Sequence, residues 1–111
     1  MENFIQPTSL DEIVDGSKES PVLIFKHSLT CPISAGAYNR TKEGLEKGLI
    51  PYPVYLVIVQ KDKELSSQIA KDLDVVHESP QLILVKDGKA VYHASHGAIQ
   101  VQEIPNTLVM Q

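Results

Sequence analysis

Short apolar runs that alternate with helical patterns constrain the fold of this chain more than any other feature. Residues 22–27 (VLIFKH) and 54–60 (VYLVIVQ) are nearly continuous apolar runs, which is typical of strands buried on both faces of a parallel sheet. Residues 80–95 (PQLILVKDGKAVYHAS) contain two further strand patterns joined by Asp87-Gly88, a pair that favours a tight hairpin turn. The sequence therefore predicts four strands.

Helical patterns separate these strands. Residues 8–20 place Ser9 three positions before Glu12, a capping-box pattern, and Gly16 predicts the end of this helix. A second helix is predicted over residues 32–47, where Gly48 suits a left-handed stop. Residues 63–75 predict a third helix and residues 97–111 a short last one. The residues expected to face inward are Leu10, Ile13, Val14, Ile33, Ala37, Tyr38, Leu45, Leu65, Ile69, Ala70, Leu73, Ile99 and Ile104.

The resulting order, α-β-α-β-α-β-β-α, predicts an α/β fold with a mixed four-stranded sheet flanked by helices. We expect the strands that are separated by helices to be parallel, whereas the hairpin must be antiparallel. The length of 111 residues fits one domain, residues 1–111, whose hydrophobic core is large enough to be stable without disulfides or a structural metal.

Composition narrows the class of protein. The formal net charge is −4 and the sequence shows no basic stripe, which argues against nucleic-acid binding. The first residues, MENFIQPTSLDEI, resemble no secretory signal, and the longest apolar run is far shorter than a membrane span. We therefore expect a cytoplasmic protein that binds neither nucleic acid nor membrane.

The chain has one cysteine, Cys31, which excludes an internal disulfide and a four-thiolate zinc site within one chain. Cys31 lies where the strand over residues 22–27 ends and the second helix begins, with Pro32 suited to the first helical position. Ligands of open α/β sheets tend to bind at this carboxyl edge. A helix N-terminus stabilises an anion by about 0.3–1 kcal/mol, so loop N–H groups or the Thr30 hydroxyl would have to add to it. The alternative is a buried structural cysteine.

Several polar residues have two open interpretations. Ser34 either hydrogen-bonds a thiolate or caps the helix, and Thr30 either contacts a substrate or caps the helix. His77 either lines a thiol groove or lies on a surface loop. Strand alternation places Lys26 and His27 on opposite faces, so at most one assists Cys31. Lys26 and Glu78 are predicted to be solvent-exposed. Only His93 and His96 of the four histidines are close in sequence, and no carboxylate cluster accompanies them, so we expect no metal site.

Residues 69–98 (IAKDLDVVHESPQLILVKDGKAVYHASHGA) resemble the C-terminal half of thioredoxin. The resemblance implies that Pro80 is a cis-proline facing Cys31, and that the backbone of Ser79 pairs with a bound thiol substrate. Thioredoxin has Cys-x-x-Cys, whereas here Ser34 occupies the place of the second cysteine. A protein with this motif can form a mixed disulfide but cannot resolve it internally.

Residues 25–34 (FKHSLTCPIS), joined to this thioredoxin-like frame, are similar to the monothiol bacilliredoxins of the YtxJ or BrxC type. The resemblance implies a thiol-disulfide oxidoreductase that removes bacillithiol from cytosolic proteins, with Cys31 as nucleophile and bacillithiol as co-substrate. Its partners would be bacillithiolated proteins and a low-molecular-weight thiol, and we expect a monomer without a bound metal or prosthetic group. The residues implied to bind the substrate thiol are Thr30, Pro32, Ser34, Ser79 and Pro80.

Two other functions remain open at this point. A thioredoxin-like domain that lacks a second cysteine could serve as a binding module without turnover. A monothiol protein could also carry a [2Fe–2S] cluster as some glutaredoxins do. Because such clusters need four thiolate ligands, that function would require a dimer and two external thiols.

Overall fold

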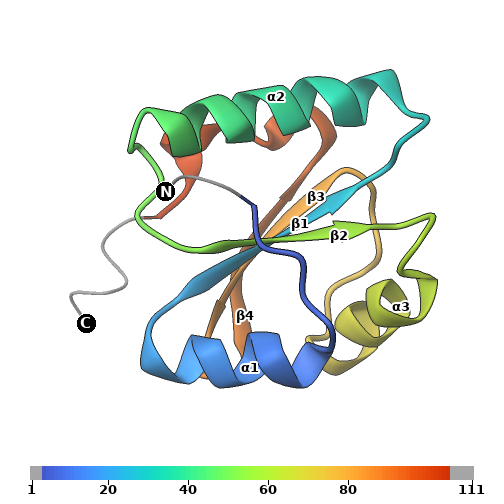
Figure 1. Cartoon of the computed structure of the whole chain (residues 1–111), viewed down its shortest axis with the longest axis vertical. Helices are drawn as coiled ribbons and strands as arrows, with labels where there is room; N and C mark the ends of the chain where they lie inside the picture. Colours follow the sequence, from blue (N-terminus) through green and yellow to red (C-terminus); the bar gives the residue numbers. More distant parts are fainter. Residues whose placement is uncertain (1–3, 106–111) are drawn as a thin grey trace.

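One mixed sheet between two helical layers makes up the molecule (Figure 1). The structure, a computed structural model, describes residues 4–105. The helix α2 (Pro32–Glu46) covers one face, and α1 (Leu10–Glu19) and α3 (Lys63–Asp72) cover the other. The strands are β1 (Val22–His27), β2 (Val54–Ile58), β3 (Gln81–Lys86) and β4 (Lys89–Ser95). The predicted fold class is therefore confirmed.

The strand order β2-β1-β3-β4 corrects one expectation about direction. β1 and β2, which are joined through α2, are parallel as predicted. β3 is antiparallel to β1, so the crossover through α3 does not produce a parallel strand. Lys26 near the end of β1 pairs with Gln81 at the start of β3, because the segment after α3 returns to the carboxyl end of β1. The hairpin of β3 and β4 turns through Asp87 and Gly88, whose φ angles are 52° and 75°.

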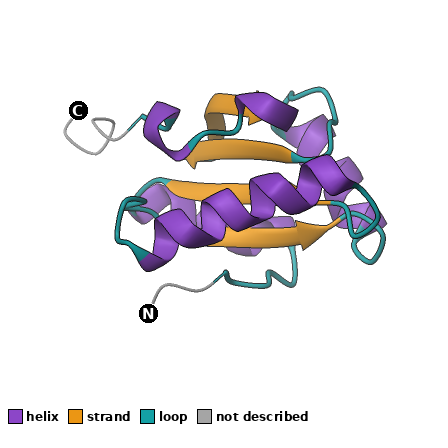
Figure 2. Cartoon of the chain, turned by 90° about the horizontal axis from the view of Figure 1, so that it is seen from above, coloured by secondary structure: helices purple, strands orange, loops and turns teal. Residues whose placement is uncertain are grey.

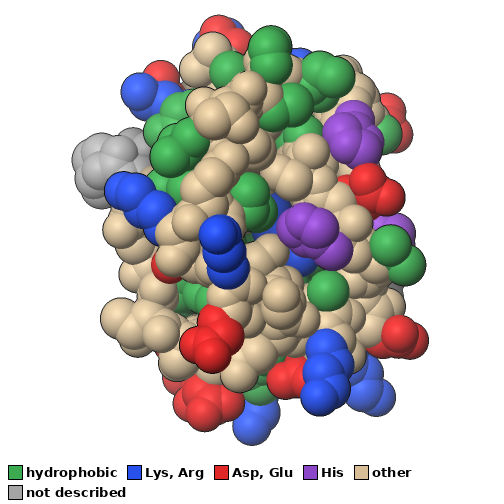
Figure 3. All heavy atoms as spheres, turned by 90° about the vertical axis from the view of Figure 1, so that its right-hand side faces the viewer, with side chains coloured by type: hydrophobic (Ala, Val, Ile, Leu, Met, Phe, Trp, Pro, Cys, Tyr) green, Lys and Arg blue, Asp and Glu red, His purple; other side chains and the backbone are tan. Residues whose placement is uncertain are grey.

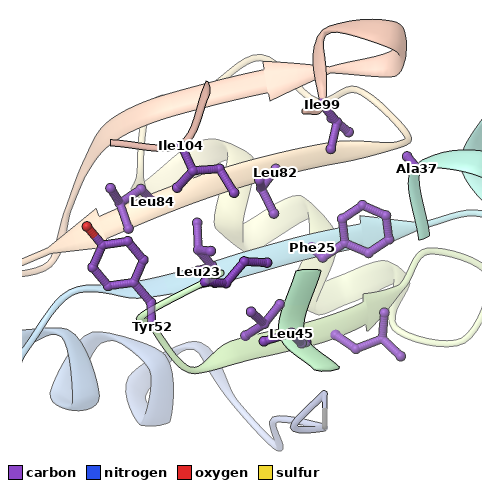
Figure 4. Packing of buried hydrophobic residues seen from close by; sticks show 12 residues of the cluster. Leu23, Phe25, Ala37, Leu45, Tyr52, Leu82, Leu84, Ile99 and Ile104 are labelled. Atoms are coloured by element: carbon purple, nitrogen blue, oxygen red, sulfur yellow. The ribbon is translucent and has the colours of Figure 1, made fainter. Parts of the chain in front are cut away.

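Two apolar clusters, one on each face of the sheet, form the core. Figure 4 shows the cluster on the α2 face, where β1 and β3 contribute Leu23, Phe25, Leu82 and Leu84. Alternate positions of the same strands, such as Ile24 and Ile83, belong to the cluster beneath α1 and α3. The central strands are thus buried on both faces, which explains why their sequences are continuous apolar runs rather than alternating ones.

Local details differ from the sequence prediction at both ends of the chain. α1 continues past Gly16 to Glu19, and Gly16 fills a close approach to β2, since a Cβ there would lie 3.2 Å from the Tyr55 hydroxyl oxygen. The predicted last helix is two short 3₁₀ turns, η1 (His96–Ala98) and η2 (Val101–Glu103), which lie beside α2 (Figure 2). Ile99 and Ile104 are buried as expected. The remainder of that predicted helix lies outside the described residues.

α2 ends at Glu46, one residue before the predicted end, and the left-handed Gly48, with φ 72°, follows its last turn as predicted. Ala37 and Leu45 are buried and Tyr38 packs against the core, as expected, whereas Ile33 is offset from the buried stripe of the helix and is 56% exposed. That buried stripe consists of Ser34, Ala37, Thr41, Gly44 and Leu45. Within residues 4–105, no helix is long and apolar enough to cross a membrane.

Candidate active site

Cys31 is the N-cap residue of α2. Its carbonyl accepts the first helical hydrogen bond, from the Ala35 N–H at 3.0 Å, and Pro32 occupies the first turn. The thiol makes no capping hydrogen bond and the residue is half-buried. The sulfur is therefore at the positive end of a helix and within reach of solvent, rather than sealed in the core.

Ser34, one turn into α2, links the loop between β1 and α2 to the helix through hydrogen bonds. Its side chain is fully buried, and its Oγ accepts a hydrogen bond from the Ser28 N–H at 2.9 Å. The same Oγ lies 2.7 Å from Nδ1 of His27, at the end of β1. Ser34 is thus inside the helix and is not its cap. The residue in the position of a second cysteine holds the Cys31 loop in place.

Gln60 holds this loop from the other side, and sequence reasoning missed it. Its Oε1 accepts from the Leu29 N–H at 3.1 Å, and its Nε2 donates to Ser28 Oγ at 2.9 Å. Nε2 also lies 3.4 Å from Thr30 Oγ1, so Thr30 contacts Gln60 and does not cap the helix. The one signal available in the sequence was that Gln60 is the polar end of the apolar run over residues 54–60, at the edge where the site was expected.

Ser79 and Pro80 lie at the same edge of the sheet as Cys31. The bond between them is cis, and Pro80 directly precedes β3, whose first residue pairs with Lys26 near the end of β1. The Pro80 carbonyl accepts from the His96 N–H at 3.0 Å. The buried Ser79 hydroxyl has no hydrogen-bond partner among residues 4–105. The β1–β3 register therefore brings Pro80 to the end of β1 that leads into the Cys31 loop.

Lys26 is not solvent-exposed, which makes that prediction wrong. It is 0% exposed, on the α3 face of β1. Its Nζ donates to the Ser66 carbonyl at 3.1 Å and lies 3.2 Å from His77 Nδ1. Removal from water lowers its pKa from 10.5 to about 8. Glu78, the other residue predicted to be exposed, is partly buried, and its Oε1 lies 3.7 Å from His96 Nε2.

Two histidines of this region have lowered pKa values. Burial lowers the pKa of His27, whose ring stacks on Tyr38 with 4.8 Å between ring centroids. Burial also lowers the pKa of His77, the Lys26 charge lowers it further, and the Glu78 carboxylate opposes the shift. His27 and Lys26 lie on opposite faces of β1, as strand alternation predicted.

Exposed apolar residues flank Cys31 in the sequence. Leu29 and Ile33, two positions to either side of Cys31, are 54% and 56% exposed. Figure 3 shows this end of the molecule, where a hydrophobic patch and histidine side chains lie near one another on the surface. In the part of the chain that the structure describes, no three His, Cys, Asp or Glu side chains are grouped to hold a metal ion.

A comparison with protein families identifies the family of this chain. The model of the monothiol bacilliredoxin BrxC family matches residues 2–104. The chain belongs to this family. Membership and the thioredoxin-like fold support a thiol oxidoreductase-type role for this protein.

Solved structures agree with this chain on the fold. A protein described as a proposed oxidoreductase with a thioredoxin fold is 38% identical, with a TM-score of 0.75 over 88% of this chain and 87% of that one. Thioredoxin from Trypanosoma brucei brucei is 14% identical, with a TM-score of 0.67 over 84% and 78%. A mutant thioredoxin from Halobacterium salinarum NRC-1 is 18% identical, with a TM-score of 0.69 over 91% and 83%. At such low identity the two thioredoxins support the fold alone.

Proposed function

We propose that this protein removes bacillithiol from mixed disulfides on cytoplasmic proteins, with Cys31 as the nucleophile. One observation carries the proposal: in a member of the monothiol bacilliredoxin family, the only cysteine of the chain is the half-exposed N-cap of α2. We place the reaction in the cytoplasm because a lone nucleophilic thiol must be kept reduced between turnovers.

The proposed reaction is one thiol-disulfide exchange followed by another. The Cys31 thiolate attacks the bacillithiol sulfur of a protein–bacillithiol disulfide. A new disulfide forms between Cys31 and bacillithiol, and the substrate cysteine leaves as a thiolate that takes a proton from water. A second thiol, either free bacillithiol or a redox partner, then attacks the bacillithiol sulfur on Cys31. Cys31 is restored, and the attacking thiol leaves as a disulfide with bacillithiol.

The surrounding residues receive proposed roles from their positions. We expect the Ser79 backbone to pair with the substrate next to its disulfide, and Pro80, Pro32 and Thr30 to line the contact. Ser34 supplies no second thiol, and its hydroxyl contacts His27 and Ser28, so its role is to hold the loop that carries Cys31. Without a resolving thiol, release of bacillithiol depends on an external thiol.

The test uses a small test protein with one bacillithiolated cysteine. Wild-type protein is expected to lower the mass of the test protein by one bacillithiol and to restore one free thiol. Cys31→Ala is expected to be inactive, and Cys31→Ser serves as the variant closest in size. A Cys31→Ala protein that removes bacillithiol at the wild-type rate would contradict the proposal.

A further inference from the structure

We propose that a groove between α3 and residues 74–77, here called the α3 groove, binds the carboxylate-bearing part of the low-molecular-weight thiol. This inference rests on the proposed function and adds the determinant that selects the thiol. Bacillithiol fits the class, because it carries its carboxylates at the end remote from its sulfur.

The α3 groove has a volume of about 580 Å³. One stripe of α3 forms a wall with Lys63, Ser66 and Lys71, and the segment that leads to Pro80 forms the other with His77. Apolar side chains of Val59, Ala70, Val75 and Val76 also line it. A space of this size and mixed lining suits a small molecule that has polar ends and a less polar body.

The charge of the α3 groove is opposite to that of the protein. The chain has a formal net charge of −4, yet two lysines, Lys63 and Lys71, and a single carboxylate, Asp74, line this groove. Among residues 4–105, neither lysine forms an ion pair. The buried ammonium of Lys26 lies directly behind, bonded to the Ser66 carbonyl and facing His77. An anionic ligand in the α3 groove would be attracted by these positive charges.

The α3 groove reaches the edge of the sheet that carries Cys31. Val59 lines it, and the Val59 N–H donates to the His27 carbonyl at 3.0 Å. Cys31 follows four positions after His27, which limits their separation to about 14 Å. The next residue after Val59, Gln60, holds the intervening loop through its bonds to Ser28 and Leu29. The α3 groove and the Cys31 loop thus meet at one edge of the sheet, and in the proposed complex a thiol whose sulfur is at Cys31 extends from this edge into the groove.

The first test compares two mixed disulfides of one test protein, one with bacillithiol and one with uncharged 2-mercaptoethanol. The double variant Lys63→Gln/Lys71→Gln is expected to lower the ratio of the two rate constants by about fivefold, and high salt is expected to lower the wild-type ratio. The matched control Lys42→Gln/Lys89→Gln removes the same charge from residues that do not line this groove. An unchanged ratio in the α3 double variant would overturn the inference.

The second test separates this inference from the proposed function. S-methyl-bacillithiol, which cannot exchange, is titrated into Cys31→Ala protein with and without the two α3 substitutions. A Kd that rises about fivefold in the double variant supports the groove even if the wild-type protein shows no turnover. Turnover of bacillithiolated protein together with equal Kd values would leave the proposed function intact and contradict the groove.

Discussion

Lys26 offers the sharpest prediction because it is a buried cation with neutral partners. Its ammonium contacts only the Ser66 carbonyl and His77 Nδ1 among the contacts of the described residues, and its side chain is 0% exposed. Replacement by methionine keeps an unbranched side chain as far as Cε and removes the charged Nζ. The Lys26→Met variant therefore isolates the cost of burying the ammonium from the packing of the side chain.

The lowered pKa of Lys26 gives the size of the expected change in stability. Burial lowers the pKa of Lys26 from 10.5 to about 8. Because one pKa unit corresponds to about 1.4 kcal/mol, burial disfavours the ammonium relative to the neutral amine by about 3 kcal/mol. Methionine avoids this cost but gives up the two hydrogen bonds, each worth about 1 kcal/mol. We expect Lys26→Met to be more stable than wild type at pH 7 by about 1–2 kcal/mol.

The difference in unfolding free energy between Lys26→Met and wild type is expected to decrease as the pH rises. Between pH 8 and 10.5 the unfolded chain holds a proton on Lys26 that the folded chain has lost. Wild-type stability from this group therefore rises as the pH rises through this window, and it is lost as the pH falls through 8. The methionine variant has no such contribution. Its advantage is expected to shrink steadily from pH 8 to pH 10.5.

Urea denaturation of both proteins at pH 7, 8, 9 and 10 measures this difference. Leu23→Met is the control, because it places methionine on the same strand in the opposite cluster and changes no titratable group. A difference in unfolding free energy between Lys26→Met and wild type that stays constant over this range would refute the reasoning. So would a variant that is less stable than wild type by more than about 1 kcal/mol at pH 7.

Three other predictions concern the loop and its neighbours. Ser34→Ala removes the acceptor of the Ser28 N–H and is expected to lower unfolding free energy in urea by about 1–3 kcal/mol; a loss below about 0.5 kcal/mol contradicts this. Gln60→Ala removes the acceptor of the Leu29 N–H, so NMR is expected to show about tenfold faster hydrogen exchange of that amide. An unchanged exchange rate would contradict the role of Gln60 in holding the loop. Because the pKa of His77 is lowered in the folded protein, the free energy of unfolding is expected to fall as the pH drops below 6.5. Thermal unfolding of His77→Gln is expected to show a smaller loss of stability over the same pH range. An equally steep loss in the variant would show that other groups cause it.

The elements with local signals could be predicted from the sequence. β1, the Asp87-Gly88 hairpin and the end of α2 at Gly48 follow from apolar runs, turn residues and a left-handed glycine, which depend on few neighbours. Gly16 has the same local signal as Gly48 but lies inside α1, where a Cβ would lie 3.2 Å from the hydroxyl of Tyr55, on a strand about forty residues away. A local signal therefore fails where a distant packing contact competes with it.

The candidate site shows the same division. Cys31 at the start of α2 followed from its strand–proline–helix context, and the place of Pro80 from the resemblance to thioredoxin. The burial of Lys26 and the bonds of Gln60 did not follow, because both depend on segments that are distant in sequence. Lysine side chains are mostly exposed in folded proteins. Only the packing of α3 over β1 places Lys26 in the interior.

The most direct test of the central claim is a single-turnover experiment with equal amounts of this protein and a bacillithiolated test protein. Intact and peptide masses, recorded over time, locate the bacillithiol. The account predicts one bacillithiol on the peptide that contains Cys31, appearing at the rate at which the test protein loses it and disappearing when free bacillithiol is added. Loss of bacillithiol from the test protein without any adduct at Cys31 would contradict it.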